Sequence, residues 1–292
     1  MTAIGFTLQP HLPTLELLAG LIEEEPDYYE VTPETLWRPG RDGAFEANGF
    51  HQRFLALRAH TGKPFVAHGV GFSVGSARPD SARRERWLGR MREDARAFEF
   101  GWYTEHHGVT VLDGRELILP LPVAMNDASV ATVRASLACM QTCVPDVGLE
   151  NSVFYFHLGE PLDEPAFFAR VLDAPRTHLL LDLHNVYTTA LNAGFEPWEY
   201  VQRLPLARVI EIHVSGGRDS DPRWLASGAT RRLDSHDDSV PETVWHLLER
   251  VLPLCANVRG VTLERMEGTV EPDDVALVRE ELRRARRIAE KR

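Results

Sequence analysis

Eight short apolar stretches divide almost the whole chain into β/α units, because each one is followed by an amphipathic or loop-plus-helix segment. The chain shows no Ser/Gly-rich linker and no shift in composition. Such regular alternation is typical of a parallel barrel in which a helix follows every strand. We therefore predict one α/β domain over residues 1–292, a single (β/α)8 TIM barrel. The expected strands are residues 3–8, 28–32, 64–70, 101–106, 147–152, 178–183, 208–214 and 259–265.

The main alternative to a barrel is an open, doubly wound parallel sheet. Its usual signature is a GxGxxG loop directly after the first strand, and the chain has no such loop there. The segment GVGFSVGS at residues 69–76 resembles it only weakly and follows the third predicted strand. The pattern therefore favours the closed barrel.

Composition narrows the class of protein. A chain of 292 residues with 43% hydrophobic content can build the core of one barrel. Its formal net charge of -11 argues against a protein that holds nucleic acid by bulk electrostatics. The N-terminus lacks the features of a signal peptide, and no apolar run approaches the roughly 18 residues of a membrane span. We expect a cytoplasmic enzyme with neither nucleic acid nor membrane as a partner.

Side chains that can bind metal ions close most of the predicted strands. A parallel barrel brings the carboxyl ends of its strands to one rim, so donors that are far apart in sequence should converge there. Burying so many carboxylates and imidazoles together is costly unless they are paired or bound to cations. The donors are His68, Glu105, His106, Glu150, Asn151, Asp182, Asn185, Glu211, His213, Asp234, His236 and Glu264.

The spacing and chemistry of these donors fit a metal site. Glu211 and His213 alternate along a strand and should point the same way, and the same holds for Asp234 and His236 in the extended run RRLDSHDD. Oxygen and nitrogen donors without cysteine suit iron, manganese or zinc, and they disfavour copper(I) or an iron–sulfur cluster. The three cysteines form neither an even disulfide framework nor a CxxC pair.

Several longer segments resemble the DUF692 family, the multinuclear non-haem iron-dependent oxidative enzymes. That family includes the methanobactin biosynthesis enzyme and the thiaglutamate pathway enzyme. The matching segments occur in order and with matching spacing between about residues 4 and 267. They are HGVGFSVGS, TEH, LENS, LLLDLHNVYTTALNAGFEP, EIHVSGG, LDSHDDSVPETVW and TLERM.

The resemblance implies a xylose-isomerase-like TIM barrel with two or three irons of mixed ferrous and ferric state. Glu211 is then expected to orient His213 or a neighbouring water. The layout also follows the related endonuclease IV fold, by analogy. The implied ligand groups are His68, His106 and Glu150; Glu150 as a bridge with Asp182, His213 and Glu264; and Asn185, Asp234 and His236.

Two segments depart from the family pattern. Many members carry Asn-Asn where this chain has His184-Asn185, and His-Ala-Glu-Asn where this chain has TPET at residues 32–35. The first change adds an imidazole near the metals, as a ligand, an acid/base group or packing. Because an imidazole titrates near neutral pH, His184 joins Glu211 as a catalytic candidate. The second change alters a rim that faces the substrate.

The resemblance implies a reaction on a peptide. We expect dioxygen as the co-substrate and a ribosomally made precursor peptide as the substrate, modified at Cys or less often at Asp or Asn. The chain has no spare domain for a leader peptide, so we expect a separate leader-binding partner protein.

Other functions of such a barrel stay open. A zinc-dependent endonuclease IV-like phosphodiesterase would use the same ligands, but the acidic balance disfavours it. A sugar isomerase-like metal enzyme normally needs a catalytic lysine, and the only lysines are Lys63 and Lys291, neither of which is at a ligand-bearing strand end. A non-catalytic metal-binding protein is the third alternative.

Overall fold

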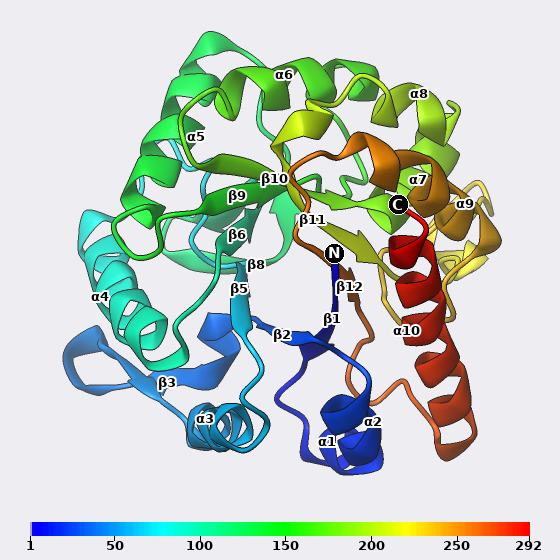
Figure 1. Ribbon diagram of the computed structural model, residues 1–292. Coiled ribbons are helices and arrows are strands. Elements are labelled where there is room, and N and C mark those ends of the chain that lie inside the picture. Colours follow the sequence, from blue (N-terminus) through cyan, green and yellow to red (C-terminus); the bar gives the residue numbers. More distant parts are fainter. Residues whose placement is uncertain (1) are drawn as a thin grey trace.

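The computed structural model describes residues 2–292 and folds them into a closed parallel barrel of eight strands (Figure 1). β1 pairs with β2 on one side and with β12 on the other, so the sheet has no free edge. This closure confirms the predicted barrel and excludes the open sheet. The barrel strands are β1 (Ala3–Leu8), β2 (Tyr28–Val31), β5 (Phe65–Gly69), β6 (Tyr103–His106), β9 (Val147–Glu150), β10 (Thr177–Asp182), β11 (Val209–Val214) and β12 (Gly260–Leu263).

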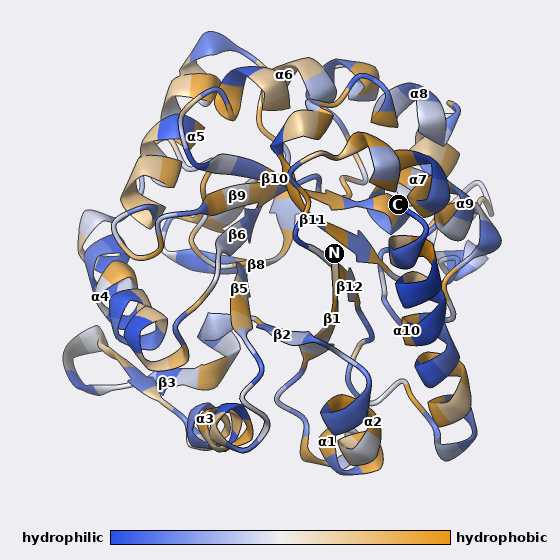
Figure 2. Cartoon of the chain, in the orientation of Figure 1, coloured by the Kyte–Doolittle hydropathy of each residue, from blue (hydrophilic) through white to orange (hydrophobic). Residues whose placement is uncertain are grey.

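Helices form a ring around the barrel (Figure 1). Hydrophilic and hydrophobic residues alternate along α10 (Figure 2), where Val278, Leu282 and Ala285 are among the buried positions. This spacing of three to four residues is that of an amphipathic helix that packs one face on the sheet. The helices are α1 (Leu12–Leu17), α2 (Ala19–Glu24), α3 (Gly49–Thr61), α4 (Ser81–Phe98), α5 (Asp127–Met140), α6 (Glu164–Val171), α7 (Leu183–Ala193), α8 (Pro197–Val201), α9 (Glu242–Val251) and α10 (Val275–Glu290).

Polar side chains begin several of these helices. Asn48, Asp80 and Asn126 accept hydrogen bonds from free backbone N–H groups at the first turns of α3, α4 and α5. At α7 the cap is Asp182, whose Oδ1 accepts from the backbone N of Asn185 at 2.6 Å. The cap uses only one carboxylate oxygen, which leaves Oδ2 of Asp182 available for another role.

Two β-hairpins that the sequence pattern did not predict stand on the barrel. β3 (Trp37–Pro39) and β4 (Phe45–Ala47) follow β2, and β7 (Val109–Leu112) and β8 (Arg115–Leu121) follow β6. Both hairpins belong to connections that leave the carboxyl end of a barrel strand. In a TIM barrel these connections build the active site.

The inside of the barrel changes from apolar to polar toward the carboxyl ends of the strands. Tyr28 and Trp102 fill a lower layer, with ring centroids 5.5 Å apart. Gly5 and Gly260 make room for this layer, because a Cβ at either position would lie 2.4 Å or less from an atom of the Tyr28 side chain. Buried polar side chains lie above the aromatic layer, between it and the rim.

The remaining structural expectations concern membranes and thiols. The described part of the chain contains no helix long and apolar enough to span a membrane. Cys139, Cys143 and Cys255 are free thiols. Burial raises the pKa of the Cys255 thiol to about 12, so this cysteine is a packing residue rather than a reactive one.

Candidate metal centre

Six strands deliver their last polar side chains to one rim of the barrel. His68, His106, Glu150 and Asp182 lie at or next to the ends of β5, β6, β9 and β10. His213 lies near the end of β11, and Glu264 directly follows β12. The convergence predicted from the strand pattern is therefore present, and it brings the donors together in three groups at the rim and a fourth below it, formed by Glu30, Glu211 and His213.

The first group is formed by His68, His106 and Glu150. Oε2 of Glu150 lies 3.5 Å from Nε2 of His68 and 3.2 Å from Nε2 of His106. The two imidazole rings are stacked, with centroids 4.6 Å apart. Three donor atoms thus face a common point, as the ligands of one metal ion do.

The second group shares Glu150 with the first and adds Asp182, His213 and Glu264. One donor atom from each of the four side chains lies within 4.8 Å of the others. Nδ1 of His213 is 2.9 Å from Oε2 of Glu264 and 3.9 Å from Oδ2 of Asp182. Glu150 belongs to both groups, so its carboxylate would be shared if each group held a metal ion.

The third group contains Asp234 and His236, as expected, together with His184. Oδ1 of Asp234 lies 2.7 Å from Nε2 of His236 and 3.5 Å from Nδ1 of His184. Asn185 donates from Nδ2 to Oε1 of Glu150 at 3.1 Å, which attaches it to the bridging carboxylate.

The segment that carries Asp234 and His236 is a loop, and the expectation of an extended run there is wrong. His236 has a left-handed backbone with φ of 50°, which a non-glycine residue adopts only where its surroundings hold it. The backbone carbonyl of His236 accepts from Met266 N at 2.8 Å, and the Asp234 N–H donates to the Tyr155 hydroxyl at 3.1 Å. These contacts, rather than strand alternation, bring the two side chains together.

Eight polar atoms in or beside these groups are buried without a well-formed hydrogen bond among the described residues, although some lie as close as Nδ1 of His213 and Oε2 of Glu264, 2.9 Å apart. Unpaired buried polar atoms are costly, and proteins rarely keep several of them together. Cations at the centre of each group would satisfy all of these atoms at once, so the residues present fit a multinuclear metal site. The atoms are Glu150 Oε2, Asp182 Oδ2, His184 Nδ1, Asn185 Oδ1, His213 Nδ1, Asp234 Oδ1, His236 Nε2 and Glu264 Oε2.

Electrostatics at the rim also calls for positive charge. Burial, together with the neighbouring carboxylates of Glu150 and Glu264, raises the pKa of Asp182 well above its usual value. Burial works to lower the pKa of His68, but the Glu150 carboxylate outweighs it and raises that pKa to about 9. The raised pKa values of Asp182 and His68 both reflect the negative charge of the neighbouring carboxylates, which metal ions would balance.

Each imidazole of the first two groups has its other ring nitrogen held by a second residue. Nδ1 of His68 lies 3.0 Å from the Thr104 hydroxyl, and Nδ1 of His106 lies 3.0 Å from the carbonyl oxygen of Gly69. Such contacts fix the tautomer and the orientation of an imidazole that binds metal. The nitrogen of each ring that faces the group is therefore the one free for a metal.

Glu30 holds the other ring nitrogen of His213, and the sequence pattern did not predict this role. Its Oε2 accepts from Nε2 of His213 at 2.9 Å, and its Oε1 accepts from the Thr7 hydroxyl at 2.8 Å. Glu30 and His213 are fully buried. The signal was available in YYEV, because a carboxylate inside a buried strand needs a partner.

Glu211 lies below the rim. Its carboxylate accepts from the Tyr28 hydroxyl, the Thr262 hydroxyl and the Trp102 indole N–H at 2.6 to 2.8 Å. Its Oε1 is 3.9 Å from Nε2 of His213. Burial and the nearby Glu30 carboxylate raise the pKa of Glu211 to about 7. The contact to His213 that we expected of Glu211 is made by Glu30.

Two further donors from the sequence face away from the groups. Glu105 accepts from the backbone N of Phe72 at 3.0 Å and from the Tyr103 hydroxyl at 2.8 Å. Asn151 uses both ends of its amide on the backbone of Asp182, each at 2.9 Å. These residues hold the strand ends in place and are not metal ligands in this geometry.

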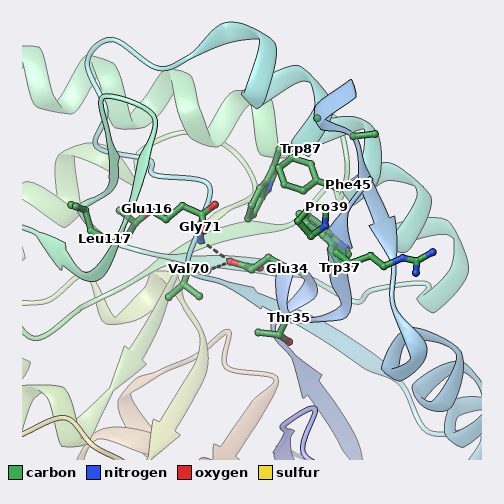
Figure 3. A pocket seen from close by; sticks show the side chains of 14 residues that line it. Glu34, Thr35, Trp37, Pro39, Phe45, Val70, Gly71, Trp87, Glu116 and Leu117 are labelled. Atoms are coloured by element: carbon green, nitrogen blue, oxygen red, sulfur yellow. Dashed lines mark hydrogen bonds between the residues drawn. The ribbon is translucent and has the colours of Figure 1, made fainter. Parts of the chain in front are cut away.

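A pocket of about 420 Å³ opens beside the rim, between the two hairpins (Figure 3). Trp37, Phe45 and Trp87 give it aromatic walls. Glu34 also lines the pocket, and it belongs to the TPET segment in which this chain departs from the family pattern. Its carboxylate accepts hydrogen bonds from the backbone N of Val70 and of Gly71, each at 2.6 Å. Val70, which lies two residues after His68, lines the pocket, so the pocket opens at the same end of the barrel as the first group, although no residue of that group lines it.

Comparison with known proteins places these features in a family. The family model described as "RiPP precursor modification enzyme MbnB/TglH/ChrH" matches residues 5–290. A UPF0276 protein of Bordetella pertussis is 33% identical over 262 residues, which cover 88% of this chain and 84% of that protein. A UPF0276 protein of Caulobacter vibrioides is 31% identical over 278 residues, covering 94% and 91%.

Solved structures of low sequence identity share the barrel. A D-tagatose 3-epimerase-like protein superposes with a TM-score of 0.61 at 14% identity, covering 99% of each chain. The 3-keto-D-glucoside 4-epimerase YcjR from E. coli gives 0.59 at 18% identity, covering 98% of this chain and 100% of that one. A xylose isomerase-like TIM barrel protein from Mycobacterium smegmatis gives 0.53 at 18%, covering 84% and 80%. At such identities the likeness concerns the fold alone.

Proposed function

Because this chain belongs to the MbnB/TglH/ChrH family of RiPP precursor modification enzymes, we propose that it uses two or three irons of mixed valence and dioxygen to oxidise one residue of a ribosomally made peptide. Cys is the residue we expect, and Asp or Asn is less favoured. The observation that carries the proposal is the convergence of nine donor side chains, with free buried atoms that face one another, at one rim of the barrel.

The donor set suits iron. Imidazoles and carboxylates without thiolates are the ligands of non-haem iron enzymes. When bound, iron would attract a thiolate or carboxylate of the substrate and transfer electrons from the substrate residue to dioxygen. The shared carboxylate of Glu150 would keep two irons close together, and Glu30 would hold His213 with Nδ1 toward the metal.

The chain exposes one side of the donor cluster. The side chains of His106, Asp234 and His236 are 21%, 20% and 17% exposed, whereas those of Asp182 and His213 are fully buried. We expect the peptide and dioxygen to approach from this open side. The buried side, held by the strands, keeps the inner ligands away from bulk water.

The pocket between the two hairpins is suited to hold a part of the peptide outside the reacting residue (Figure 3). Its aromatic walls favour an apolar side chain, and Oε2 of Glu34 is buried without a hydrogen-bond partner among the described residues. A donor group of the peptide could bind there. We propose this pocket as a substrate subsite that positions the peptide for reaction at the metals.

Exposed apolar side chains around the same rim support the proposal that a separate partner protein binds there. Leu119 in β8, Phe156 and Leu158 after β9, and Trp224 after β11 are between 52% and 69% exposed. Large exposed apolar side chains that gather on one end of a molecule mark interaction surfaces. We propose that a leader-binding protein covers them.

The rival functions are less well supported. Nζ of Lys63 donates to the carbonyl oxygen of Glu23, and Lys63 precedes β5, so it lies at the opposite end of that strand from His68. Lys291 follows α10. Neither lysine is near the rim, as a sugar isomerase would need. The net charge of -11 continues to disfavour the DNA-cleaving hydrolase.

The direct test is coexpression of this protein with the short peptide encoded beside it and with the partner protein. We expect mass spectrometry to find a modified peptide in air and unmodified peptide without oxygen. The Asp182→Ala variant should leave the peptide unmodified in air. An unchanged peptide mass in air, with iron confirmed in the protein, would contradict the proposal, and cleavage of abasic DNA would favour the hydrolase.

A further inference from the structure

We propose that His184 is a metal ligand in this chain, and that it gives the third group two imidazoles and one carboxylate, a ligand set for a ferrous ion. This inference rests on the proposed function, because it concerns one position of the same metal centre. His184 then serves as a ligand, and neither as an acid/base group nor as a packing residue. The three ligands are then His184, Asp234 and His236.

The position of the His184 ring carries the inference. His184 lies in the first turn of α7, and its side chain is fully buried. Nδ1 lies 3.5 Å from Oδ1 of Asp234 and has no hydrogen-bond partner among the described residues. Oδ1 of Asp234 and Nε2 of His236 lie 2.7 Å apart as an ion pair, and neither atom has another hydrogen-bond partner among the described residues. The unpaired Nδ1 of His184 therefore meets two further donor atoms at one point.

His184 also repeats the arrangement of the histidines in the first group. Nε2 of its ring is 3.5 Å from the hydroxyl of Thr188, one helical turn later in α7. In His68 and His106, likewise, one ring nitrogen meets an oxygen of the protein and the other faces the donors. A packing residue would not need its second nitrogen directed at a carboxylate.

The backbone leaves space for the imidazole at this place. A Cβ at Gly217 would lie 3.0 Å from Cε1 of His184 and 2.4 Å from the carbonyl oxygen of Leu233. The Gly217 position thus permits a close approach of the ring to the loop that carries Asp234 and His236. The ring is confined by this loop and by α7, so its Nδ1 stays directed at Asp234.

The chemistry of the set indicates the metal. Two imidazoles and one carboxylate with open positions are the ligands of mononuclear ferrous sites. An imidazole binds late first-row metals more strongly than a neutral amide oxygen, so the third group should bind metal more tightly in this chain than with an asparagine at position 184. The outer position would then hold its ion without help from the other two groups.

The test is an anaerobic Co²⁺ titration of the metal-free full chain, followed by visible absorption and by equilibrium dialysis. Wild type should bind three Co²⁺ per chain. His184→Asn, which restores the residue of many family members, should weaken one of the three equivalents at least about tenfold and change its absorption bands. His184→Gln, a second variant of similar size to histidine, should behave alike.

The matched control is His107→Asn. His107 is as deeply buried as His184, but its ring packs on Phe154, Phe167 and Phe168. This control should retain all three equivalents. Unchanged affinity and spectrum in both folded His184 variants would overturn the inference in favour of packing or acid/base chemistry, and so would a wild type that binds only two ions. Failure of wild type to bind any Co²⁺ would instead refute the metal centre itself.

Discussion

The inner and outer parts of the proposed metal centre are built in different ways. The inner ligands Asp182 and His213 stand on barrel strands and are fully buried. The outer ligands Asp234 and His236 stand on a loop, and 20% and 17% of their side chains are exposed. The inner part inherits the rigidity of the barrel, whereas two of the three proposed outer ligands depend on a few loop contacts and only His184 stands on a helix. We therefore expect the outer metal ion to exchange faster than the inner ones, even though His184 helps to hold it.

The largest effect should come from the inner ligands. Asp182→Ala or His213→Ala should lose the central iron and nearly all turnover, and both variants should keep a native circular dichroism spectrum because the barrel core is apolar. The free energy of unfolding should change by about 1 to 3 kcal/mol in either direction. Complete unfolding of either variant would show that the residue is structural, and it would contradict the distinction between inner and outer ligands.

The outer ligands should affect only one metal ion. Asp234→Asn should lose the iron of the third group and leave the inner pair in place, since Asp234 belongs to the third group alone. In wild type, a chelator should remove one iron quickly and two slowly, as followed by absorption. Release of all three at a single rate would show that the two parts bind metal equally well.

Substitution of Glu30 should reduce metal affinity less than loss of a ligand does, and more than substitution of a residue far from the site. Glu30→Gln weakens the hydrogen bond that orients His213 and should lower the affinity for the inner metal by about 10- to 100-fold, with altered Co²⁺ absorption bands. Glu211→Gln is the comparison, because Glu211 contacts Tyr28, Thr262 and Trp102 instead. Equal losses in the two variants would assign Glu30 a merely structural role.

The smallest effect concerns the loop. Tyr155→Phe removes the hydroxyl that accepts the Asp234 N–H and should weaken binding of the outer metal by about 1 kcal/mol or less, because a neutral hydrogen bond contributes about that much. Tyr29→Phe removes a hydroxyl that donates to Ile22 and serves as the control. Dialysis against Co²⁺ measures both variants. A larger loss of affinity for the inner metal than for the outer one would contradict the role of Tyr155 in holding the loop that carries Asp234.

The fold could be predicted because its determinants are local. All eight barrel strands coincide with apolar runs such as LLLDL and VIEIHV. Each strand lies within a few residues of its expected bounds. β3 (WRP) and β4 (FEA) are too short to show such a run, whereas β7 (VTVL) and β8 (RELILPL) contain apolar residues but pair only with each other, outside the barrel. Their pairing depends on the surroundings at the rim, which a local pattern does not contain.

The site could be predicted only as far as strand ends determine it. His68, Glu150 and His213 follow from periodicity, because a strand that ends at the rim places its last polar residue there. The roles of Glu30 and His184 depend on which side chains meet across the barrel and across the loop. His236 shows the same limit, because its left-handed backbone follows from loop contacts and not from the alternation of RRLDSHDD.

The most direct measurement is the metal content of protein purified without oxygen, determined by elemental analysis on the full chain. A multinuclear iron centre predicts two to three iron atoms per chain, and iron reconstitution of depleted protein should restore peptide modification. Stoichiometric zinc, with no gain of activity after iron reconstitution, would contradict the oxidative function and favour a hydrolase on the same barrel.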